Sequence, residues 1–199
     1  MNVNMEDEEE KRQLAVIPRS MYIRIMRNNM AHLPSLDQNV FGYAHLISGA
    51  LAGSIGLWSN SMFRTALNVT PLPIISNLSC IIIPFFTTSI FYLGIITEPL
   101  IAGDLKCSIC TGMRGAITGS LIGGAYPVML AAVTTSMLAH RYQSAPVPSP
   151  RNALPFWLKI SRPVVGRLWP LLSLQVLYNF TSSSWQHSIY LKLHELGSS

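Results

Sequence analysis

Apolar residues gather into four stretches, which polar or proline-rich segments separate. The stretches are residues 42–63, 74–97, 115–139 and 168–190, and none of them contains Asp, Glu, Lys or Arg. Each reaches the length of about 20 residues that a helix needs to cross a bilayer. The pattern predicts an all-α integral membrane protein with about four transmembrane helices in a small bundle. Three helices are the alternative, because the fourth stretch ends in the polar run TSSSWQHSIY.

These stretches define one membrane helical domain, residues 42–190, with a tail at each end. The C-terminal tail is residues 191–199. Residues 1–41 form the N-terminal tail, which has an acidic head followed by Lys and Arg among apolar residues. We expect the acidic head to be disordered, because it has little to bury. The basic part predicts either an amphipathic helix on a membrane surface or a solvated helix.

The charge content also points to a membrane. Only 12% of the residues are charged, against about 25% in a soluble domain. The net charge is +5, and between residues 42 and 192 the only acids are Glu98 and Asp104. The dispersed basic residues suit an anionic membrane surface better than nucleic acid. Lys and Arg near the span ends are almost evenly divided between the two sides, so the sequence leaves the orientation open.

Small residues recur at helical spacing in two of the stretches. Four-residue spacing places glycines on one face of a helix, where another backbone can approach closely. That face can serve packing within the chain or docking of another membrane protein. The third stretch also holds a Tyr-Pro pair that should bend it, because proline removes a backbone donor. These candidate packing or partner residues are Gly49, Gly53, Gly115, Gly119, Gly123, Tyr126 and Pro127.

The stretches lack the residue types that membrane chemistry requires. Ion-coupled transport normally needs ionisable groups inside the membrane. Catalytic and phosphate-binding motifs are also missing, and His45 has no partner at ligand spacing. The sequence therefore predicts a protein that is not an enzyme and binds neither a cofactor nor a metal.

Cys107 and Cys110 form a CxxC motif, expected in the loop before the third stretch. Such a pair can be a redox switch, half of a metal site, a local disulfide or two structural thiols. A zinc site needs four ligands, and only Cys80 remains as a further thiol. A thioredoxin-like role needs a βαβ context, which is absent. Structural thiols or a disulfide, and a redox-regulated switch, stay open as alternatives.

Several blocks of the chain resemble the transmembrane protein 126 family. The resemblance covers roughly residues 41–180, and the CxxC and LNVT blocks favour its A-type branch. The blocks are Phe63-Arg64 with Leu67-Asn68-Val69-Thr70, Pro84-Phe85-Phe86-Thr87-Thr88, Gly103-Asp104-Leu105 with the CxxC, Gly123-Gly124-Ala125-Tyr126-Pro127-Val128, Arg141-Tyr142-Gln143-Ser144-Ala145, and Trp157 with Ser161-Arg162-Pro163-Val164.

This resemblance implies a multi-pass protein of the mitochondrial inner membrane that assists assembly of respiratory complex I. A-type members are associated with the ND4 module and with insertion of newly synthesised, mitochondrially encoded proteins beside the OXA1-like insertase. The expected partners are therefore complex I membrane subunits, that insertase and other assembly factors. B-type members instead serve as a scaffold of the ND2-module assembly complex, which is one alternative. A thiol-redox membrane protein using Cys107 and Cys110 is the other.

Overall fold

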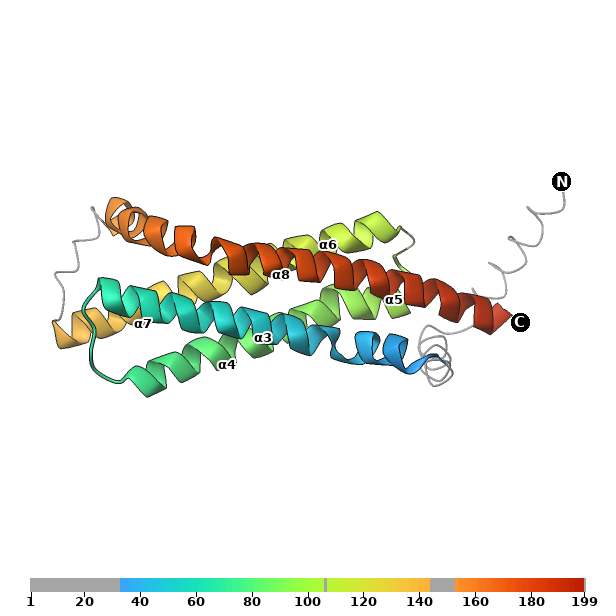
Figure 1. Cartoon of the computed structure of the whole chain (residues 1–199), viewed down its shortest axis with the longest axis horizontal. Helices are drawn as coiled ribbons and strands as arrows, with labels where there is room; N and C mark the ends of the chain where they lie inside the picture. Colours follow the sequence, from blue (N-terminus) through green and yellow to red (C-terminus); the bar gives the residue numbers. More distant parts are fainter. Residues whose placement is uncertain (1–32, 106, 144–152, 199) are drawn as a thin grey trace.

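Four helical rods run antiparallel along the long axis of the molecule in the part of the chain that the structure describes (Figure 1). This computed structural model describes residues 33–105, 107–143 and 153–198. The rods are α3 (Ser35–Ala66); α4 (Pro73–Tyr92) with the π-helix η2 (Leu93–Thr97) and α5 (Glu98–Ile101); α6 (Ser108–Ser120) with the π-helix η3 (Leu121–Ala125) and α7 (Tyr126–Tyr142); and α8 (Ala153–Ser198).

The expected all-α membrane bundle is confirmed, and the described residues contain no strand. Three rods are long and apolar enough to cross a membrane, namely Ser35–Ala66, Pro73–Ile101 and Ser108–Tyr142. The fourth rod, α8, is longer than any of them at 46 residues but less apolar. By composition alone, α8 therefore counts as a further helix of the bundle and not as a candidate span.

The helices extend beyond the predicted spans. α3 begins at Ser35, inside the segment assigned to the N-terminal tail, and carries Asp37 in its first turn, where the helix dipole favours a carboxylate. α8 begins at Ala153 and continues to Ser198, so it takes in most of the expected C-terminal tail. The difference arises because apolar patterning marks only the part suited to lipid, whereas helical hydrogen bonds continue past it.

Two further expectations concern neighbouring segments. The CxxC was expected in a loop, but only Cys107 lies outside α6, and Cys110 belongs to its first turn. The acidic head, the basic segment and the PVPSP run fall in 1–32 and 144–152, outside the described residues.

A π-helical turn interrupts the second rod and the third rod, in each case just before a proline. η2 ends two residues before Pro99, and η3 ends two residues before Pro127. A proline lacks the N–H that would bond the carbonyl four residues earlier, and its ring pushes against that carbonyl. A π-helical turn is wider, so it accommodates both the missing hydrogen bond and the contact of the ring with the carbonyl. Such turns occur mostly inside α-helices. α4, in contrast, continues through Pro84 without a change of helix type.

The rods form two closely packed pairs, α3 with α4 and α6 with α8, and α3 also contacts α7 and α8. Apolar clusters lie at both ends. One joins the start of α3, α5 and the end of α8 through Phe41, Leu100 and Ile189. The other joins the end of α3, α7 and the start of α8 through Phe63, Ala131 and Val164. Each end of the bundle therefore has its own core.

Candidate functional site

The glycine face of α3 lies against the backbone of α4. A Cβ atom added at Gly49 would come within 2.7 Å of the Phe85 carbonyl oxygen, and one at Gly53 within 3.0 Å of the Ile81 carbonyl oxygen. At Gly56 it would collide with the Cys80 carbonyl oxygen. A side chain at these positions would push the helices apart, so the absence of Cβ atoms sets the distance between the rods.

The glycine face of α6 and η3 lies against α8. A Cβ atom at Gly115 would collide with the Asn179 carbonyl oxygen and Ser183 Oγ, and one at Gly119 would lie 2.9 Å from Asn179 Cβ. At Gly123 it would meet the side chain of Gln175. Both glycine faces are therefore covered by helices of the same chain.

The face of α8 that meets these glycines is polar. Its fully or almost fully buried residues recur at helical spacing: Gln175, Asn179, Ser182, Ser183, Gln186 and His187. Leu177 and Trp185, on the outer side of the same helix, are 61% and 49% exposed. The helix thus places polar side chains inside the bundle and apolar ones outside, the reverse of a helix on a water-soluble protein.

Hydrogen bonds connect this polar face to α3. Ser48 Oγ donates to Asn179 Oδ1 at 2.8 Å, and Gln175 Nε2 donates to the Ser48 carbonyl oxygen at 3.2 Å. Asn179 Nδ2 in turn donates to the Gln175 carbonyl oxygen at 2.7 Å. The second rod joins through Tyr92, whose hydroxyl lies 3.0 Å from Ser182 Oγ.

A second polar cluster centres on Asn60 of α3. Its side-chain oxygen accepts hydrogen bonds from Ser76 and Thr135 at 3.1 Å each, and its Nδ2 donates to Asn77 Oδ1 at 2.7 Å. Three rods are thereby tied together. Sequence reasoning missed both clusters, although the Ser, Asn and Gln residues inside apolar stretches were a signal for them.

An apolar groove opens on the side of the bundle between η3, α7 and α8. Its volume is about 640 Å³. The lining is mainly aliphatic, with one aromatic side chain, three serines (Ser120, Ser136 and Ser161) and small residues at its η3 end. The lining residues include Gly124, Ala125, Val128, Ala132, Trp157, Val165, Leu172 and Val176. Of the proposed partner residues near it, Tyr126 is partly exposed and Pro127 is buried, and neither lines the groove.

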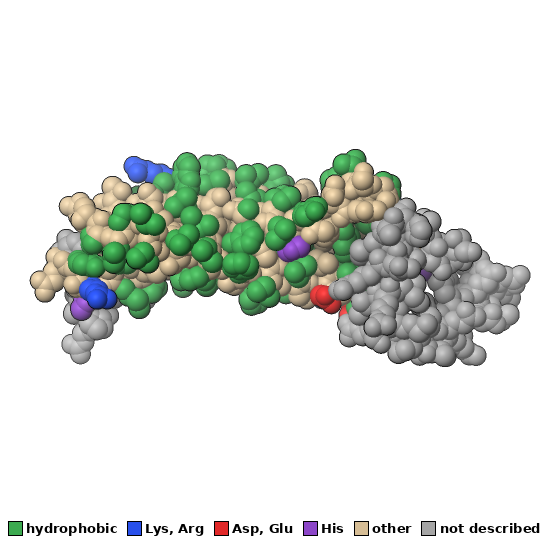
Figure 2. All heavy atoms as spheres, turned by 90° about the horizontal axis from the view of Figure 1, so that it is seen from below, with side chains coloured by type: hydrophobic (Ala, Val, Ile, Leu, Met, Phe, Trp, Pro, Cys, Tyr) green, Lys and Arg blue, Asp and Glu red, His purple; other side chains and the backbone are tan. Residues whose placement is uncertain are grey.

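The described acidic side chains lie at one end of the bundle, whereas cations lie at both ends, with Arg114 and Lys192 at the acidic end. Asp37, Glu98 and Asp104 lie near the start of α3 and the end of the second rod, whereas Arg64, Arg141, Lys159, Arg162 and Arg167 lie at the opposite end. Figure 2 shows hydrophobic side chains along the length of the visible face, with cations near one end and acids near the other. This distribution suits a protein whose middle lies in lipid.

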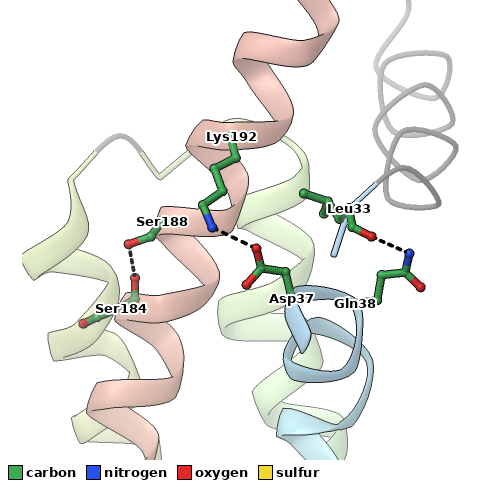
Figure 3. A network of polar contacts seen from close by, with 6 residues as sticks. All are labelled: Leu33, Asp37, Gln38, Ser184, Ser188 and Lys192. Carbon is green, nitrogen blue, oxygen red and sulfur yellow. Dashed lines mark hydrogen bonds and ion pairs between the residues drawn. The ribbon is translucent and has the colours of Figure 1, made fainter. Parts of the chain in front are cut away.

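One ion pair ties the first rod to the last at the acidic end (Figure 3). Lys192 Nζ lies 2.8 Å from Asp37 Oδ2, and the carboxylate side chain is only 8% exposed. Nearby, Gln38 Nε2 donates to the Leu33 carbonyl oxygen at 2.9 Å. Removing Lys192 would leave the carboxylate of Asp37 buried without this counter-charge, which is unfavourable.

The two thiols of the CxxC motif lie at the N-terminus of α6. Cys107 is the N-cap residue, and its Sγ accepts a hydrogen bond from the Cys110 backbone N–H at 3.3 Å. Both thiols are exposed and are not joined to each other. The Cys110 thiol, followed by this backbone N–H, lowers the pKa of Cys107 below that of an ordinary thiol. A lowered thiol pKa increases the thiolate, the reactive form.

Metal binding finds no support among the described residues, where no group of three His, Cys, Asp or Glu side chains is close enough to hold an ion. His187 is buried, and neither ring nitrogen has a hydrogen-bond partner. His45 lies on α3 and belongs to no such group.

The fold and these features define a small polytopic membrane protein built from helices with polar contacts inside and apolar side chains outside. A sequence model of the family described as Transmembrane protein 126 matches residues 20–199. The chain belongs to this family, as the sequence blocks indicated.

Curated relatives agree with this assignment. Transmembrane protein 126A of Mus musculus is 36% identical over 88% of this chain and 90% of its own length. Transmembrane protein 126A of Homo sapiens is 39% identical over 82% of this chain and 84% of its own length. A more distant relative, named complex I assembly factor TMEM126B, mitochondrial, of Homo sapiens, is 23% identical over 88% of this chain and 76% of its own length. No solved structure matches the chain.

Proposed function

We propose that this protein is a non-enzymatic assembly factor of the mitochondrial inner membrane that shields membrane segments of respiratory complex I during assembly. The observation that carries the proposal is the apolar groove between η3, α7 and α8. It opens sideways, and its lining offers no fixed charge. Gly124 and Ala125 at its η3 end would let a helix of an incompletely assembled membrane subunit approach closely, and close packing of this kind is what associates helices in lipid.

The names of the relatives support the same direction. Family members that match this chain at 23–27% identity are named complex I assembly factor. By the resemblance of its motifs to the A-type branch, this chain would act on the ND4 module. It would do so beside the OXA1-like insertase, while newly synthesised mitochondrially encoded proteins enter the membrane.

The test is capture of labelled translation products. Mitochondrial translation is pulse-labelled, this protein is retrieved with a mild detergent, and its unlabelled partners are identified by mass spectrometry. We expect labelled complex I membrane subunits together with the insertase. Recovery of late assembly factors without nascent chains would instead favour a scaffold of the ND2-module type, and recovery of neither would refute the proposal.

A groove-filling variant connects this test to the structure. Ala125 lines the groove and is exposed, so Ala125→Phe should occupy part of it without disturbing the core. Ala50→Phe is the matched control, because Ala50 is exposed on α3 and lies outside the groove. We expect several-fold less labelled protein with Ala125→Phe and no loss with Ala50→Phe. Equal recovery with both variants would show that the groove is not the contact.

The second candidate, a thiol-redox function, rests on Cys107, which caps α6 and whose thiol has a lowered pKa. Replacing both cysteines of the motif with serine separates it from the first. If complex I assembly is unchanged in the double variant, the thiol function is excluded, and the chaperone function is unaffected.

A further inference from the structure

Arg64 is a buried cation at the end of a membrane-spanning helix. It lies in the last turn of α3 and is only 9% exposed. Its Nη2 donates to the Pro71 carbonyl oxygen at 3.0 Å, whereas Nη1 is shielded and has no hydrogen-bond partner. No carboxylate among the described side chains pairs with it, since the acids lie at the far end of the bundle. A buried guanidinium in this state is unfavourable unless an anion comes close.

A polar hollow adjoins Arg64. Its volume is about 400 Å³, and Arg64 lines it together with hydroxyl and amide side chains of α3, the following turn and α4. The side-chain oxygen Oδ1 of Asn77 accepts a hydrogen bond from Asn60 Nδ2, which leaves the Asn77 Nδ2 donor for the hollow. The polar lining residues are Ser61, Thr65, Asn68, Thr70 and Asn77. The Thr65 hydroxyl already donates to the Ser61 carbonyl oxygen. The other hydroxyl and amide groups beside a cation without a counter-charge match the oxygens of a phosphate group.

A second, more apolar groove lies on the other side of Ser61 and Thr65. It has a volume of about 630 Å³ and runs between the end of α3 and the start of α8. Met62, Ile160 and Val164 supply apolar surface, and Lys159 and Arg167 supply two exposed cations about two helical turns apart. Ser61 and Thr65 line both cavities, so the polar hollow and the apolar groove are neighbours.

We propose that these two cavities together bind one anionic phospholipid, with its phosphate in the hollow beside Arg64 and an acyl chain along the groove beside Lys159 and Arg167. The position at the end of α3 corresponds to the headgroup level of a bilayer that the helix spans. Cations beside an apolar groove at that level attract anionic lipids rather than zwitterionic ones. A free phosphate would satisfy the hollow but would leave the adjoining groove without a function.

The test is lipid binding to the full chain in a mild detergent, measured by native mass spectrometry and by thermal unfolding. Phosphatidylglycerol, phosphatidylcholine and inorganic phosphate are added separately. We expect phosphatidylglycerol to bind preferentially and to raise the unfolding temperature, since a ligand of the folded state stabilises it. Equal binding of phosphatidylcholine would overturn the proposal, and so would an equal effect of inorganic phosphate.

Matched variants locate the site. Arg167→Gln and Lys159→Gln should each weaken phosphatidylglycerol binding about fivefold, the value of one cation near an anionic lipid. Arg162→Gln removes the same charge at the same end from an exposed residue that lines neither cavity, and it should change binding less than twofold. If Arg162→Gln weakens binding as much as Arg167→Gln, the attraction is diffuse and the proposed site is wrong.

The hollow itself is tested with two variants. Arg64→Gln should abolish the preference for the anionic lipid. Because Arg64 also bonds the Pro71 carbonyl oxygen, Thr70→Val provides a milder change of nearly the same shape at an exposed residue. We expect Thr70→Val to weaken phosphatidylglycerol binding severalfold while the unfolding temperature without lipid stays unchanged. Unaltered binding in Thr70→Val would overturn the assignment of the phosphate to this hollow.

Discussion

Asn60 and Asn179 are fully buried, and each joins two or more rods through its side chain. In lipid, the apolar surfaces of helices gain little by meeting each other, so packing of small residues and hydrogen bonds between helices supply the attraction. At the surface, the residue with the most distinctive chemistry is Cys107, which caps α6 and receives a hydrogen bond from the following turn.

Cys107 should react with iodoacetamide at a lower pH than an ordinary thiol. The Cys110 thiol and backbone N–H stabilise the thiolate, so the midpoint of the alkylation rate falls below the usual value of about 8.5. Cys110→Ala removes the thiol donor and should raise that midpoint. Cys80→Ala is the control, because Cys80 is buried and distant in the fold. An unshifted midpoint in Cys110→Ala would show that the thiol donor is not the cause.

At the scale of elements, glycine faces form the contact within both helix pairs. Prolines determine where the π-helical turns lie. Glycines of α3 approach backbone carbonyl oxygens of α4, and Gly115 of α6 likewise approaches the Asn179 carbonyl oxygen of α8, beside polar side chains. Both pairs therefore use glycine to bring a backbone close to its neighbour. η2 and η3 each contact both α4 and α6, so the second and third rods are neighbours at these turns. Each of the two rods changes helical pitch just before a proline.

Alanine substitution should separate packed glycines from open ones. Gly115→Ala places a methyl group against the Asn179 carbonyl oxygen, and overpacking of this kind costs about 1–3 kcal/mol. Gly42→Ala is the control, because nothing lies within 4 Å of the added Cβ; helix propensity there favours alanine by about 1 kcal/mol. Thermal unfolding in detergent should show a lower midpoint for Gly115→Ala only. Equal midpoints for the two variants would contradict the close approach.

At the scale of the whole molecule, α8 decides how many times the chain crosses the membrane. Its mean hydropathy alone does not mark it as a span. However, its polar residues are buried against α3 and α6, and Leu174, Leu177 and Trp185 are exposed on the outside. Because Asn179, Ser182 and Ser183 make their hydrogen bonds inside the bundle, we infer that α8 crosses the bilayer as the fourth span.

This inference predicts the side on which the C-terminus lies. With four spans, a C-terminal tag and the exposed Cys107 and Cys110 lie on the same side, because the end of α8 and the start of α6 share one end of the bundle (Figure 1). A thiol reagent that cannot cross membranes, combined with protease access to the tag, measures both positions. If the tag and the cysteines are reached from opposite sides, α8 does not cross.

Several features of this protein follow from the sequence alone. Uncharged apolar stretches of sufficient length predict helices in a membrane, because lipid leaves backbone groups no other partner than the helix itself. The first three stretches became the three apolar rods. Glycine spacing likewise placed Gly115, Gly119 and Gly123 on one face, since helical periodicity is local.

Only the tertiary structure determined what those faces meet. Gln175, Asn179 and Ser183 look unfavourable in a membrane helix until the glycines of α6 and Ser48 of α3 are placed beside them. The bundle also brings Arg64 together with Lys159 and Arg167, which are about a hundred residues away in the chain. Hydropathy and helical spacing depend on residues within a few turns, whereas polar satisfaction and the shape of a binding site depend on which rods become neighbours.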